Sequence, residues 1–405
     1  MRKILLTLLI CTFFSIISFA QNTWQTKAPY IPGKRAGSNV FGISDFGYVF
    51  GGCDTAVQAH NDLWMYDPAN DQWTQRASLP GAARYSAVSC VIGNTAYIGT
   101  GFDGSTYYND WWEYNTGTNS WSQKSNFPGA VRSTGISCSI NDKAYVGMGK
   151  GQTWYGDWYE YDPAGNSWTQ KTAFPAGPRQ NGVAFGIGDY AYVGLGSVNN
   201  TYSVNDMYKY DPVNDNWTTV ASFPLLDGVY AVGSFVINNK GFVCGGTDYT
   251  NLHTEGYEYD PVNDSWSPIA AFSNVSPPRY FREGFSVRGK GYLVGGSIDM
   301  TLGTTGYRGD LIEYSSKYTG IDEIGKNNFS ISYNHSSKEF VFSSSDVRGE
   351  YAVSIYNSAG SLISKFQTET NYGKSKPIWI ASGIYVYTLE SKLGQKVCGK
   401  FSVMD

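Results

Sequence analysis

The sequence Leu-Trp-Met-Tyr-Asp-Pro-Ala-Asn-Asp-Gln-Trp occupies residues 63–73 and is one of a series of related phrases along the chain. Each phrase ends on a tryptophan, and the spacings between the six tryptophans are 49, 48, 47, 49 and 49 residues. Neither a helix nor a strand has such a period, so the spacing predicts a repeated supersecondary unit. The tryptophans are Trp24, Trp73, Trp121, Trp168, Trp217 and Trp266.

A second signature lies midway between the tryptophans, where an aromatic residue precedes one or two glycines, as at Tyr48–Gly52 and Tyr97–Gly101. Within one unit the pattern predicts four short strands, A to D, separated by turn residues. In the second unit these strands are expected at 85–92, 95–100, 110–115 and 120–123. The unit is therefore predicted to be a four-stranded antiparallel sheet.

The two ends of the repeat region are incomplete in complementary ways. Residues 22–25 resemble a D strand without strands A to C, and residues 310–314 resemble a C strand without a following D strand. Repeated sheets leave unpaired edges unless the ring closes. We therefore expect the N-terminal strand to complete the sixth unit.

The motifs Tyr-x-x-Gly-Gly, Asp-x-x-x-Tyr and Trp at this spacing resemble Kelch repeats over residues 22–316. The resemblance, to the bacterial secreted type of the galactose oxidase/Kelch-like superfamily, implies an all-β fold. It implies a six-bladed Kelch β-propeller at residues 21–320, closed by the N-terminal strand. The helical patterns that a TIM barrel or a helical solenoid would need are missing from the sequence.

The residue patterns at the two ends of the chain predict targeting signals. Arg2 and Lys3 precede an apolar run and Ser18-Phe19-Ala20, which predicts a signal peptide at residues 1–20 and no membrane-spanning segment in the mature chain. Residues 321–405 alternate polar and apolar side chains, which predicts a small C-terminal β-sandwich. Segments 353–360 and 382–387 resemble the C-terminal sorting domain of type IX-secreted proteins, which implies contact with that secretion machinery and a secreted or cell-surface location. The alternative is a periplasmic protein with an accessory sandwich.

Composition excludes several classes of partner. The formal net charge is −4 and no basic stripe is visible, which argues against nucleic acid binding. The mature chain keeps five cysteines at 53, 90, 138, 244 and 398, and this odd count argues against a disulfide scaffold. We expect the cysteines to be buried small hydrophobes and the protein to be a monomer.

Regular arginines and acids mark one end of the predicted ring. An arginine follows the tryptophan by eleven residues in the first four units and by thirteen in the sixth, whereas the fifth has Gly228. An acid stands four residues before each C-strand tyrosine, as Asp62 does before Tyr66. Antiparallel strands place the D–A and B–C loops at the same end, so arginines and acids are expected to pair there, or to bind a carboxylate. The arginines are Arg35, Arg84, Arg132, Arg179 and Arg279.

Departures from the repeat are the better functional candidates. Arg282 and Glu283 extend the sixth D–A segment, Arg308 lies in the longest B–C loop, and Asp227 breaks the basic pattern of its region. Glu283 with Arg282 or Arg279 forms a weak candidate acid/base pair; the alternative is a surface ion pair. Aromatic residues in the B–C loops suit a saccharide or peptide ligand, or packing between blades. The ligand-binding candidates among them are Tyr107, Trp154, Tyr202 and Tyr249.

Copper oxidation is poorly supported, because the galactose oxidase site needs two histidines and a tyrosine linked to cysteine. His60 and His253 fall in different B–C loops, and no Cys–Tyr motif is evident near them. No cofactor or metal is therefore expected. The sequence favours a non-enzymatic, exported propeller that binds a protein or glycan through its D–A/B–C face. The alternative is an enzyme similar to the Kelch-type sialic acid mutarotases, acting on a sugar acid.

Overall fold

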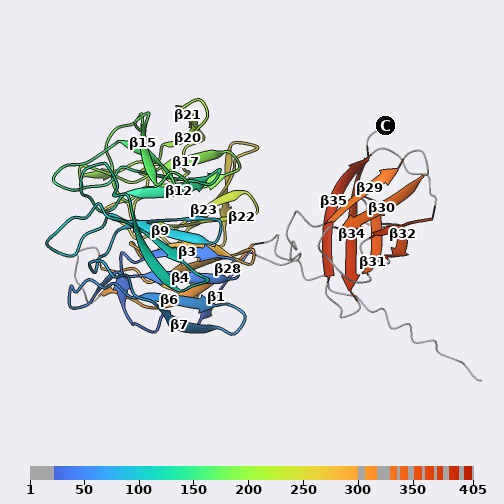
Figure 1. Ribbon diagram of the computed structural model, residues 1–405, viewed down its shortest axis with the longest axis horizontal. Coiled ribbons are helices and arrows are strands. Elements are labelled where there is room, and N and C mark those ends of the chain that lie inside the picture. Colours follow the sequence, from blue (N-terminus) through green and yellow to red (C-terminus); the bar gives the residue numbers. More distant parts are fainter. Residues whose placement is uncertain are drawn as a thin grey trace, which may run out of the picture. The chain divides into compact units, whose positions relative to one another are not determined.

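The computed structural model describes residues 22–299, 306–316, 329–334, 338–344, 351–357, 361–368, 372–376, 383–391 and 396–403. The secondary structure of these residues is all β, as predicted, and the chain divides into two compact units (Figure 1). One unit is Asn22–Ser315 and the other includes Ser316–Asp405. The predicted signal peptide lies outside the described residues.

Six four-stranded antiparallel sheets make up the first unit, each running A, B, C, D from its inner to its outer edge. The first three sheets contain the strands β3 (Asn39–Ile43), β4 (Phe46–Phe50), β6 (Leu63–Asp67), β7 (Gln72–Arg76); β8 (Val88–Ile92), β9 (Thr95–Gly99), β10 (Trp111–Asn115), β11 (Ser120–Lys124); β12 (Ile136–Ile140), β13 (Lys143–Gly147), β14 (Trp158–Asp162) and β15 (Ser167–Lys171). The next three contain β16 (Val183–Ile187), β17 (Tyr190–Gly194), β20 (Met207–Asp211), β21 (Asn216–Val220); β22 (Gly233–Ile237), β23 (Lys240–Cys244), β24 (Gly256–Asp260), β25 (Ser265–Ile269); β26 (Glu283–Val287), β27 (Lys290–Val294), β28 (Leu311–Ser315) and β1 (Thr23–Lys27).

The ring closes at both its outer and its inner edge. The N-terminal strand β1 pairs antiparallel with β28, with Trp24 opposite Tyr314, which confirms that the N-terminal strand completes the last sheet. The A strands contact one another in the order β3, β8, β12, β16, β22, β26 and back to β3. A cavity of about 240 Å³ lies among the middle residues of these A strands.

The six tryptophans connect neighbouring sheets. Each stands opposite the C-strand tyrosine of its own sheet, and its indole N–H donates to a backbone carbonyl that follows the D strand of the preceding sheet. For Trp168 the acceptor is the carbonyl of Ser125, at 2.8 Å. The aspartate or asparagine two residues ahead of the tryptophan accepts a hydrogen bond from the same tyrosine in all six sheets. The regular spacing of the tryptophans in the sequence therefore reflects a hydrogen bond that each sheet makes with its neighbour.

One strand boundary differs from the expectation. Strand A of the second sheet was predicted from residue 85, but β8 begins at Val88. Ser86 has a φ of 50°, in the left-handed region, so the backbone cannot continue as a strand through this residue. The other three strands of that sheet lie within a residue of their predicted bounds.

The second unit contains two antiparallel sheets. The larger has the order β32 (Leu362–Gln367), β31 (Tyr351–Asn357), β34 (Gly383–Ser391) and β35 (Lys396–Val403). The smaller has the order β29 (Phe329–Asn334), β30 (Glu339–Ser344) and β33 (Tyr372–Lys374). Phe340 and Tyr385, one from each sheet, lie with ring centroids 6.2 Å apart.

Candidate functional site

The D–A and B–C loops lie at one end of the ring, which we call the mouth face. Short strands there pair β2 (Arg35–Ala36) with β5 (Cys53–Asp54) and β18 (Ser197–Val198) with β19 (Tyr202–Ser203). A glycine after each B strand donates its N–H to a D–A carbonyl of the next sheet, and the series returns from Gly296 to Arg35. The mouth face is therefore cross-linked around the whole ring.

The five regular arginines are buried in the mouth face and paired. Arg84 and Arg132 are 0% exposed, and the most exposed, Arg35, is 5%. Each pairs with the aspartate that precedes the C strand of its own sheet and donates to a backbone carbonyl at the end of strand B. The pairs are Arg35–Asp62, Arg84–Asp110, Arg132–Asp157, Arg179–Asp206 and Arg279–Asp310.

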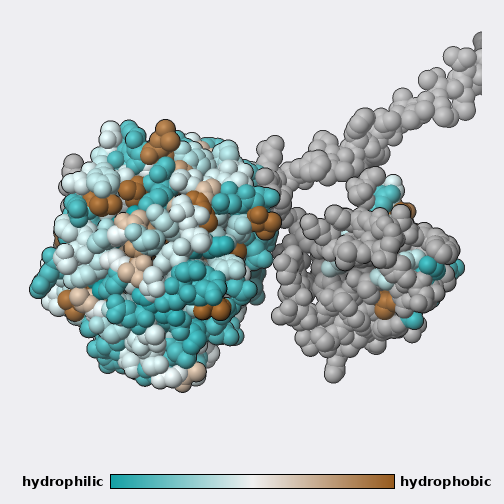
Figure 2. Space-filling model, turned by 90° about the horizontal axis from the view of Figure 1, so that it is seen from above, coloured by the Kyte–Doolittle hydropathy of each residue, from teal (hydrophilic) through white to brown (hydrophobic). Residues whose placement is uncertain are grey.

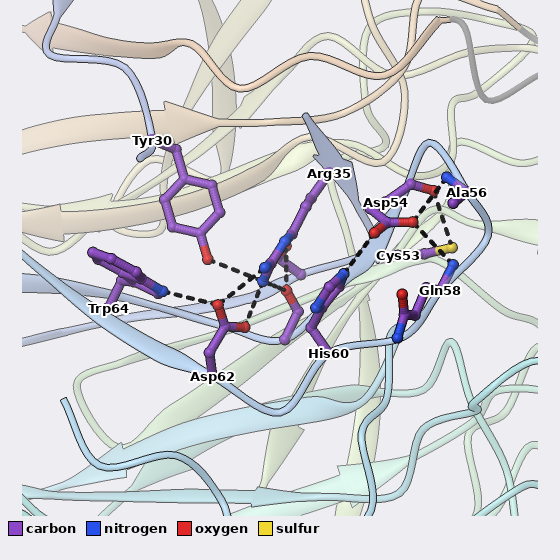
Figure 3. Close-up of polar contacts among 11 residues, drawn as sticks. Tyr30, Arg35, Cys53, Asp54, Ala56, Gln58, His60, Asp62 and Trp64 are labelled. Carbon is purple, nitrogen blue, oxygen red and sulfur yellow. Dashed lines mark hydrogen bonds and ion pairs between the residues drawn. The ribbon is translucent and has the colours of Figure 1, made fainter. Parts of the chain in front are cut away.

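Arg35 illustrates the geometry (Figure 3). Its Nη2 lies 3.0 Å from one carboxylate oxygen of Asp62, its Nη1 donates to the carbonyl of Gly51 at 2.9 Å, and Trp64 donates to the same carboxylate. Such a bidentate, buried pair fixes the guanidinium in place. Of the two predicted roles for these arginines, pairing around the mouth is the one that this geometry favours.

The sixth sheet places a second arginine on the same acid. Arg282 is 1% exposed, and its Nη2 lies 3.4 Å from Asp310, which Arg279 also contacts. Burial and then repulsion from Arg279 lower the pKa of Arg282 to about 9. Its Nη1 donates to the hydroxyl of Ser276 at 3.0 Å. Arg282 thus points into the protein, and the predicted pairing of Arg282 with Glu283 does not form.

Glu283 begins β26 at a position where β8, β12 and β16 have Val88, Ile136 and Val183. It lines a narrow void, too small for a water molecule, beside Arg35 and Ser38 of the first sheet. Burial raises the pKa of Glu283 to about 8. The structure records no hydrogen bond or ion pair of this carboxyl within residues 22–299. Burial therefore favours the protonated form of Glu283, a partly exposed side chain set between the sixth and first sheets.

Three further aspartates, which the sequence did not single out, shape the B–C loops. Asp54, Asp103 and Asp248 each accept two backbone N–H groups from residues two to four positions ahead. Their second oxygens bind a side chain of the same loop: His60 at 2.8 Å, the hydroxyl of Tyr108, and His253 at 3.2 Å. The hydrogen bond from Tyr108 lowers the pKa of Asp103. These carboxylates and both histidines stabilise loops.

The described residues contain no group of three or more His, Cys, Asp or Glu side chains that could hold a metal ion. The structure does bring a cysteine to a tyrosine, which sequence reasoning missed. The thiol of Cys53 lies within hydrogen-bonding reach of Tyr307, and burial raises the pKa of Cys53 to about 11. Neither histidine joins this pair, because His60 is bound to Asp54 and His253 to Asp248 and Glu255.

A circle of left-handed residues surrounds the channel at the mouth. The residue two positions before the start of each A strand has a positive φ, between 50° and 63°. The N–H of each of the last five donates to the carbonyl of the one before, at 2.7 to 2.9 Å. Left-handed non-glycine residues are uncommon, and here the bonds between sheets compensate their cost. They are Gly37, Ser86, Thr134, Asn181, Ala231 and Phe281.

The side chains around this circle divide the mouth into two halves. Sheets five, six and two contribute rings: Phe102 stacks on Tyr107 at 4.4 Å, and Tyr230 lies 4.5 Å from Tyr249. Sheets three and four contribute hydroxyl, amide and ammonium groups. We call the first set the aromatic arc, consisting of Tyr85, Phe102, Tyr107, Tyr230, Tyr249, Tyr280, Phe281 and Tyr307. We call the second set the polar arc, consisting of Ser133, Thr134, Lys150, Gln180, Asn181 and Asn200.

The remaining candidates take different places. Trp154 packs under the ammonium of Lys150 at 5.0 Å, and Tyr202 is 55% exposed at the start of β19. Arg308 is half-buried and donates to the carbonyl of Tyr307 at 2.9 Å. The structure therefore brings Tyr107 and Tyr249 to the aromatic arc, whereas Trp154, Tyr202 and Arg308 lie outside it.

Comparisons with known proteins agree with this architecture. The KLHDC2/KLHL20/DRC7 Kelch-repeats domain matches residues 11–180, and the Kelch motif matches residues 229–273. The solved structure of YjhT matches with 18% sequence identity and a TM-score of 0.59, over 70% of this chain and 95% of that chain. No curated protein matches the sequence. Sheet topology, Kelch-repeat matches and structural similarity together support a Kelch-type β-propeller fold for the first unit.

Proposed function

We propose that the protein is an exported, non-enzymatic binding module that recognises a protein or glycan through the mouth face of a six-bladed propeller. The exposed apolar side chains carry this proposal. The described residues of the propeller expose seven large apolar side chains, and five of them belong to D–A or B–C loops. Those five are Ile31, Val57, Val131, Tyr202 and Leu226. Exposed apolar groups among polar neighbours are typical of interaction surfaces.

The remainder of the surface supports the same choice of face. In the view of Figure 2 the first unit is mainly hydrophilic, with small and separate hydrophobic patches. The other two exposed apolar side chains, Val213 and Val262, stand at C–D turns on the opposite end, at 83% and 90% exposure. They supply a matched control for the mouth face.

The experiment compares two double variants of the purified mature protein on a glycan array and a panel of extracellular proteins. We expect Tyr202→Asp/Leu226→Asp to abolish binding and Val213→Asp/Val262→Asp to retain it, with both variants folded by circular dichroism. Loss of binding only in the second variant would place the interaction on the other end of the ring.

Export rests on the two ends of the chain. We propose residues 1–20 as a signal peptide and residues 321–405 as a type IX sorting domain with a β-sandwich fold. The described residues include no helix of the length and apolar character that crossing a membrane requires. A fluorescent protein fused to residues 317–405 behind the signal peptide is expected at the cell surface or in the medium. Its retention in the periplasm would remove the sorting role of the tail.

A sialic acid mutarotase-like activity is the second candidate, and Glu283 is the observation that favours it. A carboxyl group whose pKa is raised to about 8 suits proton transfer near neutral pH. The carboxylate-binding role expected of the arginines is weakened, because all five already hold aspartates. Anomer exchange of N-acetylneuraminic acid, followed by NMR, is expected to be unaccelerated by the protein. Acceleration that Glu283→Gln removes would establish the enzyme instead.

A further inference from the structure

We propose that the mouth face binds a neutral saccharide between the aromatic arc and the polar arc. This inference rests on the binding function proposed above and names the chemical class of its ligand. Three features carry it: the asymmetric arrangement of rings at the mouth, uncommitted amide groups opposite them, and the internal neutralisation of the charged groups.

The rings occur where the repeat does not require them. The six equivalent positions just ahead of the left-handed circle are Ala36, Tyr85, Ser133, Gln180, Tyr230 and Tyr280. Each pairs with the B–C loop of its own sheet through the backbone, whatever its side chain. Sheets one, three and four form the same pairing without an aromatic residue, so the tyrosines are not needed for the fold. Their concentration on one side of the channel therefore indicates a ligand.

The rings have the amphipathic character that a sugar ring matches. Tyr85, Phe102 and Tyr107 form a connected group, with centroids 5.7 Å and 4.4 Å apart, and all three are half-buried. A half-buried tyrosine presents an apolar ring and a polar hydroxyl together. A pyranose has an apolar C–H face and a rim of hydroxyls, so it suits a site with rings on one side and polar groups on the other.

The polar arc has hydrogen-bonding capacity left over. The hydroxyl of Thr134 donates to the carbonyl of Ser133 at 2.6 Å and lies 3.1 Å from the amide oxygen of Gln180, whose Nε2 donates to Asn200. Within residues 22–299, the Nδ2 donors of Asn200 have no recorded acceptor. Within residues 22–299 the amide of Asn181 makes no recorded hydrogen bond, and the residue is partly exposed at the channel mouth. An amide supplies a donor and an acceptor side by side, which is the pairing that neighbouring sugar hydroxyls require.

Charge decides between a neutral and an acidic sugar. The regular arginines are at most 5% exposed and already paired. The carboxylates of the B–C loops accept N–H groups of their own loops. Lys150 is the cation of the polar arc, and its ammonium lies over the ring of Trp154. A carboxylate on the ligand would find no bidentate partner among the regular arginines, so a neutral sugar fits better.

The test uses the purified mature protein and saturation-transfer NMR. The probes are neutral oligosaccharides of glucose, galactose, mannose and N-acetylglucosamine, with N-acetylneuraminic acid and galacturonic acid as acidic comparators. We expect binding of a neutral member, with saturation strongest at its ring C–H protons. Tyr107→Ala and Tyr249→Ala are each expected to weaken that binding about tenfold by calorimetry, equivalent to about 1.4 kcal/mol. Tyr159→Ala is the control, because Tyr159 packs on Phe127 in an outer strand.

The outcomes separate this inference from the binding function itself. Preference for the acidic sugars, or neutral-sugar binding that both arc variants leave unchanged, overturns the neutral-saccharide site. Absence of saccharide binding, with a protein partner that Tyr202→Asp/Leu226→Asp still removes, overturns the saccharide site and leaves the binding module in place. Loss of both kinds of binding overturns both proposals.

Discussion

Replacing Glu283 by glutamine tests whether the seam between the sixth and first sheets contains a protonated carboxyl. The pKa of this group is raised from 4.5 to about 8 because burial disfavours its charged form. Below pH 4.5 the carboxyl is neutral in both folded and unfolded chains, so it costs nothing. Between pH 4.5 and 8 the unfolded chain loses the proton and the folded chain keeps it. The folded state therefore loses about 1.4 kcal/mol of stability per pH unit over this range.

At pH 7 the accumulated cost is about 3.5 kcal/mol, from 2.5 pH units at about 1.4 kcal/mol each. Glu283→Gln removes it, although a buried amide without a partner carries a penalty of its own of about 1–3 kcal/mol. The pH dependence is thus more informative than the absolute value. The stability of the variant relative to the natural protein should rise from pH 5 to pH 8 and then level off.

Urea unfolding followed by tryptophan fluorescence at pH 5, 6, 7, 8 and 9 measures this difference. Glu283→Val, which introduces the residue found at Val88 and Val183, should give the same slope with a different offset. A difference that is independent of pH would show that the carboxyl is solvated. A fall in relative stability with pH would show that Glu283 is ionised and paired, for instance with Arg35 across the void.

Three further predictions concern the repeated contacts. Arg132→Met leaves Asp157 without its buried cation and should lower the unfolding free energy by about 3 kcal/mol. The double variant Arg132→Met/Asp157→Asn should recover part of this loss in thermal unfolding. An equal loss of stability in both variants would argue against a stabilising ion pair. Deleting residues 22–27 removes β1 and exposes the edge of β28. Light scattering should then detect association, or the unfolding transition should become less cooperative. A monomer of unchanged stability would contradict closure of the ring by this strand. Trp168→Phe removes the hydrogen bond to the carbonyl of Ser125 and should cost about 1 kcal/mol in urea unfolding; no measurable change would mean that this bond adds nothing to the ring.

The fold was predictable because the repeat is marked by large side chains, the tryptophans, whose tyrosine partners lie close to them in the sequence. Trp24 indicated that β1 completes the last sheet, and the turn residues placed three of the four strands of the second sheet within a residue of their observed bounds. The pairing of Arg84 with Asp110 was also one of two expected roles, because both residues recur at fixed spacings. When every unit has the same backbone, residues that recur at a fixed spacing make the same contact in each unit, so one predicted pair predicts the others.

The mouth was harder to predict, because its side chains meet only after six sheets have closed. The left-handed conformation of Ser86 depends on its N–H bond to Gly37 of the preceding sheet, 49 residues earlier. The approach of Cys53 to Tyr307 joins the first and last units of the ring. One signal was available: aligning the six units places Tyr, Tyr and Tyr against Ala, Ser and Gln ahead of the A strands. Those irregular positions form the aromatic and polar arcs.

We propose that the regular residues hold the ring together and that the irregular residues at its mouth bind the ligand. A single comparison of Arg84→Met with Tyr107→Ala tests this division, with melting temperature and saccharide affinity measured on both proteins. Arg84→Met is expected to lower the melting temperature and to leave the affinity of the folded protein unchanged. Tyr107→Ala is expected to weaken binding about tenfold, equivalent to about 1.4 kcal/mol, with little change in melting temperature. The reverse result, binding lost with the arginine and stability lost with the tyrosine, would contradict it.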